Sequence, residues 1–218
     1  PIEETSLLEP PSKREQPRIP FGWLVERGLL RPGEMLYGPR RRYAAKVRAE
    51  VIAAIEQGAY GRIAVAMYEW AADFSYTEVF GWTLIENGDD AMRVSDLILA
   101  APNVRLNRTS ISGAIRKGVE VLEASPYDGF RRVIDISGDG PNNQGDRGVP
   151  ARDAAVAKGI VINGLPLMTR GGPGFGFNIE DLDAYYRDCV IGGPGSFLVP
   201  VTDWEQFPEA VRRKPYSV

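Results

Sequence analysis

The 218-residue sequence contains no histidine and one cysteine, Cys189. Histidine is the commonest general base and a common zinc ligand, so Ser-His-Asp and Cys-His triads and histidine-based zinc sites are excluded. A single cysteine cannot form a disulfide within the chain. Any catalysis would therefore rely on carboxylates, lysine or a hard metal ion held by oxygen ligands.

Long hydrophobic runs are also absent. No stretch approaches the ~20 apolar residues that cross a bilayer. The apolar segment nearest the N-terminus, Phe21–Val25, is too short for the core of a signal peptide. The chain is therefore expected to be soluble, without a membrane span or an export signal. If its N-terminus is misassigned or processed, a periplasmic or secreted location is expected instead.

The formal net charge is only −3, although basic residues cluster at Arg40–Arg42. Such a cluster suits an acidic partner or nucleic acid. A short run of charges is more often the solvated start of a helix, and we prefer that interpretation here. No nucleic-acid partner is therefore predicted.

Apolar runs and amphipathic segments alternate along most of the chain. Residues 1–20 hold many prolines and charges and are predicted to form an extended or disordered lead-in, followed by a single domain at 21–218. Strands are predicted at 62–72, 76–83, 132–137, 160–165 and 196–201. Helices are predicted at 40–57, 89–101, 109–124, 150–158, 179–189 and 204–214. This order predicts an α/β fold with a mostly parallel sheet of five or six strands, in which the strands near Ile63, Val133 and Val161 are central and buried.

Two loops follow the pattern expected of a ligand site, because ligands of such sheets bind outside the carboxyl ends of the strands. Ser137–Asn143 leaves a predicted strand and presents Asp139 between two glycines. Asp139 either faces a ligand or is an ordinary turn residue. In the other loop, Thr109 or Ser110 either caps the following helix or offers a hydroxyl to a hard cation.

Three further features have simpler structural interpretations. The glycine-rich segment Gly171–Phe177 lacks the GxxxxGK[ST] pattern of a phosphate-binding loop and is predicted to be a mobile surface loop or lid. Asp135 lies within a predicted buried strand and is expected to be a hydrogen-bonded structural carboxylate. Cys189 lies beside apolar residues in a predicted helix and is expected to be an inert buried thiol.

Several segments occur in an order that resembles a known bacterial family. They are Gly61–Val65, Glu69–Ala71, Thr109–Ile115, Arg131–Gly145, Gly159–Pro166 and Tyr185–Gly195. Together they resemble a family of unknown function related to von Willebrand factor A domains, over a region from about residue 43 to the C-terminus. The resemblance implies a Rossmann-like, doubly wound sheet with a metal-ion-dependent adhesion site at its carboxyl edge.

In such an adhesion site, three loops bind a magnesium-type ion. The resemblance implies an Asp-x-Ser-x-Ser loop after the first strand, a threonine in the second loop and an aspartate in the third. Thr109 matches the second position and Asp139 the third. Oxygen ligands of this kind suit Mg²⁺. The open coordination position would take a carboxylate from a protein partner.

The chain departs from the family pattern at the first loop. No aspartate occurs before Asp73, and spacing back from Tyr43 places the expected aspartate near Glu26. The two serine positions then fall near Gly28 and Leu30, which have no hydroxyl. Either the site has decayed, or residues 1–40 come from a shifted reading frame or a misassigned start.

The leading hypothesis is a non-enzymatic binding domain with a degenerate adhesion site. Its expected ligand is an unidentified protein. Its expected metal-binding residues are Thr109 and Asp139, with Glu26 as a weaker candidate. Its expected affinity for Mg²⁺ is weak or absent. One alternative is a metal-assisted hydrolase that uses Asp139 and Asp135. The other is a structural domain with no site.

Overall fold

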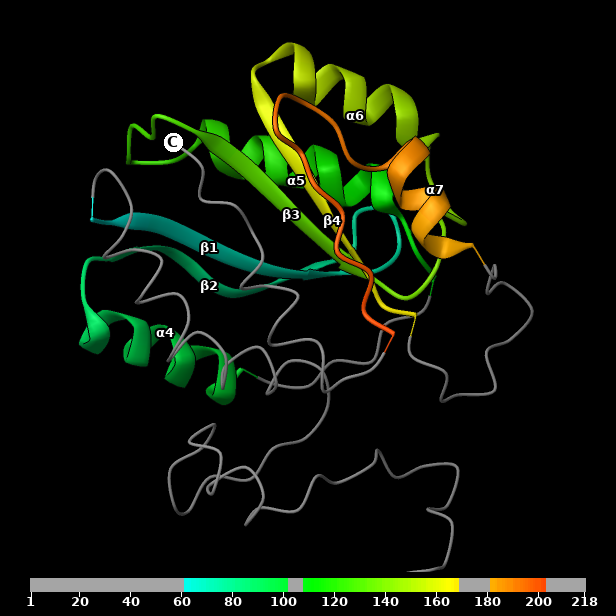
Figure 1. The fold of residues 1–218 in the computed structure, drawn as a ribbon. Coiled ribbons are helices and arrows are strands. Elements are labelled where there is room, and N and C mark those ends of the chain that lie inside the picture. Colours follow the sequence, from blue (N-terminus) through cyan, green and yellow to red (C-terminus); the bar gives the residue numbers. More distant parts are fainter. Residues whose placement is uncertain (1–60, 102–107, 169–180, 203–218) are drawn as a thin grey trace, which may run out of the picture.

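The computed structural model describes residues 61–101, 108–168 and 181–202. The described residues form β1 (Ile63–Trp70), β2 (Tyr76–Ile85), α4 (Gly88–Ala100), α5 (Ile111–Glu123), β3 (Arg132–Gly138), α6 (Gly148–Ala157), β4 (Ile160–Pro166) and α7 (Leu182–Cys189). Helices lie on both sides of the strands, which confirms the predicted doubly wound α/β class (Figure 1). The predicted lead-in at 1–20, the helices at 40–57 and 204–214, Glu26 and the loop 171–177 lie outside the described residues.

β1 and β2 form an antiparallel hairpin. Ile63 pairs with Ile85 at one end and Trp70 pairs with Tyr76 at the other. Below the hairpin in Figure 1, α4 covers one of its faces. Because apolar residues recur along one side of α4, that helix and the strands share a small core, made of Phe80, Ile85, Ala91, Val94 and Ile98.

β3 and β4 pair in parallel, in a register that runs from Arg132–Ile160 to Gly138–Pro166. The helices α5, α6 and α7 pack against this pair (Figure 1). The resulting core is larger than the first and includes Ile111, Ile115, Ile136, Ala155, Ile160, Ile162, Leu182, Tyr186 and Val190. The parallel part of the predicted sheet is therefore centred on β4.

The predicted strand at 196–201 lies beside β4. Gly164 pairs with Leu198, and Leu167 pairs with Val201, both in parallel, but these are isolated bridges. The Asn163 side chain accepts a hydrogen bond of 3.2 Å from the Phe197 amide, which ties the segment to β4. The predicted segment is therefore correctly placed next to β4, although it does not form a continuous strand.

The prediction that three strands are buried is correct only for β4, whose seven residues are all buried. Every residue of β1 is half-buried, and in β3 only Ile136 is buried. Among the described strands, β1 pairs only with β2 and β3 only with β4, whereas β4 has neighbours on both edges. Asp135 of β3 is exposed, so its predicted burial is wrong, but it does accept a hydrogen bond of 2.9 Å from Asn163.

The two halves of the structure meet where β1 and β3 end. A Cβ placed on Gly138, the last residue of β3, would lie 3.4 Å from the ring of Trp70, the last residue of β1. The Ala71 carbonyl accepts a hydrogen bond of 2.6 Å from the Ser110 amide. The carboxyl ends of β1 and β3 therefore share one edge, which we call the carboxyl edge. Among the described helices, none has the length and apolar composition needed to cross a membrane.

Candidate functional site

The loop before α5 and the loop after β3 lie against each other at the carboxyl edge. Thr109 makes the closest contacts: its carbonyl accepts from the Asn143 amide at 2.8 Å and from the Gln144 amide at 3.2 Å. Its own amide donates to the Asn143 side chain at 2.8 Å. Backbone groups thus hold the two loops together from both sides.

Thr109 and Asp139 lie in the same part of the structure, as the sequence predicts. A Cβ placed on Gly140, the neighbour of Asp139, would stand 3.9 Å from the Thr109 hydroxyl. Asp139 is exposed and Thr109 is half-buried. The carboxylate therefore meets solvent directly beside the threonine loop.

Ser110, and not Thr109, caps α5. The Ser110 hydroxyl accepts a hydrogen bond of 3.2 Å from the Gly113 amide, and Ser110 is the N-cap residue of the helix. It therefore satisfies one of the amides that a helix leaves unpaired in its first turn. The Thr109 hydroxyl has no capping role, which leaves the ligand interpretation open for that residue.

A third loop, between β1 and β2, joins this edge through Asp73. The Asp73 carboxylate accepts from Arg116 at 2.6 Å and from the Ser110 hydroxyl at 3.1 Å. The Asp73 amide donates to the Gln144 side chain at 3.0 Å. Arg116 also donates to Asp146 at 2.8 Å. We call these five residues the Asp73 cluster; it ties all three loops together and compensates the charge of Asp73 with an arginine.

Two glycines make the Asp73 cluster sterically feasible. A Cβ on Gly113 would lie 2.5 Å from the Asp73 carboxylate and 2.9 Å from the Ser110 hydroxyl. Gly145 has a φ of +77°, and its Cβ would lie 2.6 Å from the same hydroxyl. Any side chain at these positions would displace the cluster, and Gly145 also adopts a conformation that favours glycine.

Asn142 connects the carboxyl edge to α7. Its side-chain oxygen accepts from the Ser112 amide at 3.1 Å, and its backbone amide donates to the Tyr185 hydroxyl at 3.2 Å. Burial raises the pKa of Tyr185, the hydrogen bond from Asn142 acts in the opposite direction, and a Coulombic interaction with Cys189 raises the pKa again. Cys189 is half-buried, so its predicted full burial is not met.

Two non-glycine residues with positive φ flank the site. Phe74 has a φ of 61° and is 83% exposed, and Arg108 has a φ of 74° and is also exposed. Such conformations are costly for residues with a side chain, and they cluster at functional sites. Both residues adjoin the loops that carry Asp73 and Thr109.

Sequence reasoning identified Thr109 and Asp139 but not the Asp73 cluster. Asp73 and Asp146 each follow a strand in the chain, which was the available signal, but their common partner Arg116 lies on a helix. Only the fold shows that these three residues meet. Within the described part of the chain, no group of three or more acidic, histidine or cysteine side chains is placed to hold a metal ion.

Solved structures with the same fold support the von Willebrand factor A-like architecture. BatB from Bacteroides thetaiotaomicron is 18% identical, with a TM-score of 0.50, over 78% of this chain and 85% of that one. Proximal thread matrix protein 1 from the mussel byssus is 10% identical, with a TM-score of 0.54, over 79% and 41%. The pilus adhesin SpaC from Lactobacillus rhamnosus GG is 11% identical, with a TM-score of 0.55, over 81% and 27%.

At these identities the solved structures establish the fold alone. The sequence itself gives the closer relationship. The family described as "Protein of unknown function (DUF1194)" matches residues 40–216, which is most of the chain, and the protein therefore belongs to that family.

Proposed function

We propose that this protein is a non-catalytic binding domain, with its ligand site at the carboxyl edge around Thr109 and Asp139. The observation that carries the proposal is the backbone clamp between Thr109 and Asn143, which holds two loops beside an exposed carboxylate. Ligands of open α/β sheets bind at this edge. A rigid pair of loops is also a suitable platform for a protein ligand, because little ordering is required on binding.

The oxygen atoms at this edge suit a divalent cation in kind but are few in number. The Thr109 hydroxyl and the Asp139 carboxylate are hard donors of the type that Mg²⁺ prefers. Asp73, another acid at the edge, is already bound by Arg116 and Ser110. Glu26, the expected third residue, lies outside the described residues. We therefore propose that Mg²⁺ binds weakly, with a dissociation constant above the ~10⁻⁴–10⁻³ M of the weakest protein calcium sites.

A bound cation would offer its open coordination position to a carboxylate of a protein ligand. The side chains of this chain would do the rest: Asp139 would hold the ion, and Thr109 would fix its place against the clamped loops. SpaC, one protein with a similar fold, is a pilus adhesin. That likeness is compatible with a binding role, but the proposal here rests on the geometry of the edge.

The composition favours binding over catalysis. The chain has no histidine, and two serines at the edge, Ser110 and Ser112, are buried, with their hydroxyl oxygens 3.4 Å apart. Asp135, named with Asp139 in the hydrolase alternative, is hydrogen-bonded to Asn163 of the neighbouring strand. The Ser110 hydroxyl does donate to the Asp73 carboxylate, but Ser110 is buried and that carboxylate also binds Arg116, so we do not develop the hydrolase further.

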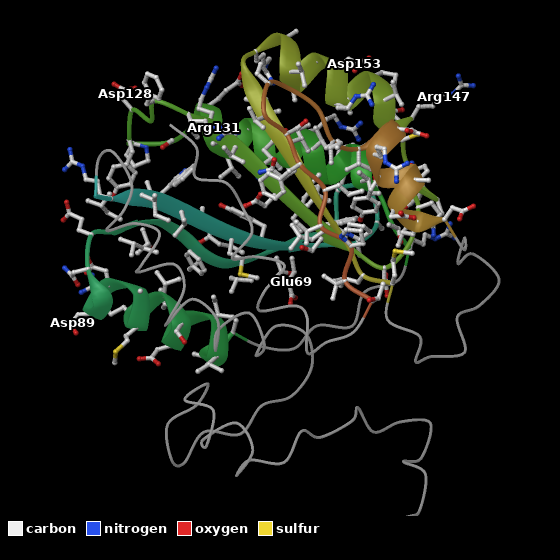
Figure 2. All side chains as sticks on the ribbon, viewed as in Figure 1. Glu69, Asp89, Asp128, Arg131, Arg147 and Asp153 are labelled. Carbon is white, nitrogen blue, oxygen red and sulfur yellow. The ribbon has the colours of Figure 1, made fainter. Side chains whose placement is uncertain are left out.

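The test is an NMR titration of the ¹⁵N-labelled chain with Mg²⁺, repeated with Mn²⁺. We expect the amide signals of Thr109 and Gly140 to shift progressively up to tens of millimolar Mg²⁺, and Asp139→Asn to remove the shift. Asp128→Asn is the matched control, because Figure 2 places Asp128 beside the start of β3, away from the carboxyl edge. Shifts that survive in Asp139→Asn, or the absence of any shift at the edge, would favour a structural domain without a cation site.

A second set of variants tests the assignment of the first loop. The triple variant Glu26→Asp, Gly28→Ser and Leu30→Ser restores the Asp-x-Ser-x-Ser pattern. We expect it to bind Mg²⁺ more tightly than the natural chain in isothermal titration. Unchanged affinity would show that the first loop has been placed incorrectly, and micromolar binding by the natural chain would show that its ligand set has been underestimated.

A further inference from the structure

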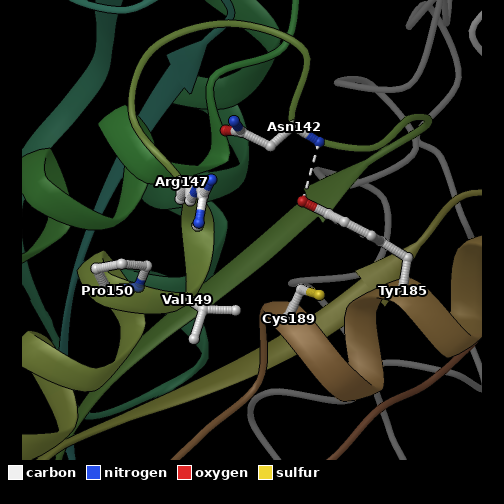
Figure 3. A pocket seen from close by; sticks show the side chains of 7 residues that line it. Asn142, Arg147, Val149, Pro150, Tyr185 and Cys189 are labelled. Carbon is white, nitrogen blue, oxygen red and sulfur yellow. Dashed lines mark hydrogen bonds between the residues drawn. The ribbon is translucent and has the colours of Figure 1, made fainter.

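A second candidate site lies between the first turn of α6 and the helix α7. A cavity of about 440 Å³ opens there, beside the loop that follows β3. Figure 3 shows Arg147 and Tyr185 on opposite sides of this cavity, with Val149 and Cys189 lying along its floor between them. Its volume falls in the range of about 300–1,000 Å³ that is usual for small-molecule sites. The cavity is distinct from the Thr109 and Asp139 site, although Asn142 adjoins both.

The polar groups around the cavity are hydrogen-bond donors. Arg147 is exposed and makes no ion pair with the described residues. The Tyr185 oxygen accepts a hydrogen bond from the Asn142 amide, which leaves its own proton for a ligand. No side chain caps the first turn of α6, in which Gly148 and Val149 have an amide N–H and Pro150 has none.

None of the described residues that line the cavity is acidic, and part of its wall is apolar. Val149, Pro150 and the half-buried Cys189 form this apolar surface. A ligand that satisfies the donors must bring acceptor oxygens, and the positive charge of Arg147 favours an anion. The apolar walls require that this anion carry a hydrophobic body, which excludes a bare inorganic ion as the best fit.

We propose that this cavity binds a carboxylate attached to a short apolar body. The carboxylate accepts hydrogen bonds from Arg147 and Tyr185, and the apolar body packs against Val149, Pro150 and Cys189. A free carboxylic acid with a short apolar chain and the C-terminal residue of a peptide share this chemistry. The two sources differ in the amide group beside the carboxylate, which the experiment below uses to separate them.

Cys189 provides a built-in reporter, because it is the only cysteine of the chain and lines the cavity. The rate of alkylation by the neutral reagent iodoacetamide is measured on the full chain with and without N-acetyl-leucine. We expect the acid to slow alkylation in a saturable manner, whereas N-acetyl-leucinamide at the same ionic strength has little effect. Equal protection by the acid and the amide, or no protection by the acid, would overturn the proposal.

Variants locate the carboxylate. Arg147→Gln should weaken N-acetyl-leucine binding about 10-fold or more, because it removes a charge-assisted hydrogen bond. Arg131→Gln is the matched control: Arg131 lies near the start of β3, away from α7, in Figure 2. If the acid protects Cys189 in Arg147→Gln at the same concentrations as in the natural chain, Arg147 does not bind the carboxylate and the proposal is overturned. Isothermal titration of each variant with N-acetyl-leucine compares the same affinities without relying on alkylation of Cys189.

A final arm separates the two sources of the carboxylate. Protection by 3-methylbutanoate as effective as that by N-acetyl-leucine supports a free acid, because the amide group then adds nothing. Protection confined to N-acetyl-leucine supports a peptide C-terminus. Asp139→Asn should leave both results unchanged, so failure of the carboxyl-edge site and failure of this cavity are distinguishable.

Discussion

The β1–β2 half and the β3–β4 half of this structure differ in how fully their strands are covered. All seven residues of β4 are buried, whereas all eight residues of β1 are half-buried. Both strands are apolar runs in the sequence, and that pattern predicts that both are central. Apolar composition therefore predicted where the strands lie, but burial depends on which neighbours each strand acquires, and only β4 has described neighbours on both edges.

The largest expected effect comes from truncating one isoleucine in each half. Ile162 of β4 is 0% exposed, and its replacement by alanine should lower the free energy of unfolding by about 2–5 kcal/mol. Ile63 of β1 is only partly buried at the edge of the smaller core, so Ile63→Ala should cost about 1 kcal/mol. Urea denaturation of both variants measures the difference. Equal losses would show that the two strands are equally covered in solution.

The next effect compares two ion pairs. Arg116 binds both Asp73 and Asp146, and the Asp73 side chain is 16% exposed. Arg116→Gln should cost about 1–2 kcal/mol, because a mostly buried carboxylate loses its cation. Arg93 pairs with Asp90 across a helical turn of α4 and is 67% exposed, against 35% for Arg116. Asp90 is 12% exposed but keeps a hydrogen bond from the Glu86 amide, so Arg93→Gln should cost less than about 1 kcal/mol. Thermal unfolding measures both losses. A larger loss of stability in Arg93→Gln than in Arg116→Gln would contradict this order.

Helix caps give a smaller and sharper comparison. Ser110 caps α5 and is 1% exposed, and its hydroxyl also donates to Asp73. Asn87 caps α4 at the surface, where it accepts from the Asp89 and Asp90 amides at 3.0 Å. We expect Ser110→Ala to cost about 2 kcal/mol and Asn87→Ala about 1 kcal/mol. The free energy of unfolding in urea tests this order, and a larger loss for Asn87→Ala would argue against the role of Ser110 in the Asp73 cluster.

The sequence predicted most element positions because each depends on local pattern. The helix α5 was expected at 109–124 from its apolar repeat and its serine and threonine cap residues, and it runs over Ile111–Glu123. The proximity of the Thr109 and Asp139 loops was also predictable, because both were assigned to the carboxyl edge. That assignment came from a family resemblance and from the rule that ligands bind where parallel strands end.

The Asp73 cluster was not predictable for the opposite reason. Asp73 and Arg116 are 43 positions apart, and Arg116 and Asp146 are 30 positions apart. None of these three residues belongs to a local motif, so their pairing follows only from the way two loops and the helix α5 meet. The cavity beside α7 is similar, since Arg147 and Tyr185 come from two different segments brought together by the packing of α6 and α7.

The smallest expected effect is a dependence of stability on alkaline pH. Burial is the largest cause that raises the pKa of Tyr68 in β1 and of Tyr185 in α7 above 10.0; at Tyr68, the hydrogen bond donated to Glu78 raises it further. A folded-state pKa above the unfolded value stabilises the fold fully below about pH 10, and this contribution is lost as the pH rises through the folded-state pKa.

Phenylalanine variants show how much the tyrosine of each half contributes to the loss of stability at alkaline pH. We expect the free energy of unfolding in urea to fall as the pH rises above about 10, and the fall to be smaller in both Tyr68→Phe and Tyr185→Phe, because a phenylalanine ring has no proton to lose. Tyr127→Phe is the control, since Tyr127 is 38% exposed. Tyr185→Phe also removes the acceptor of the Asn142 amide, so it should lower stability at neutral pH as well. A fall as steep as that of the natural chain in both variants would show that neither tyrosine contributes to the alkaline limb, whereas a change confined to Tyr185→Phe would place the titrating group in the better covered half.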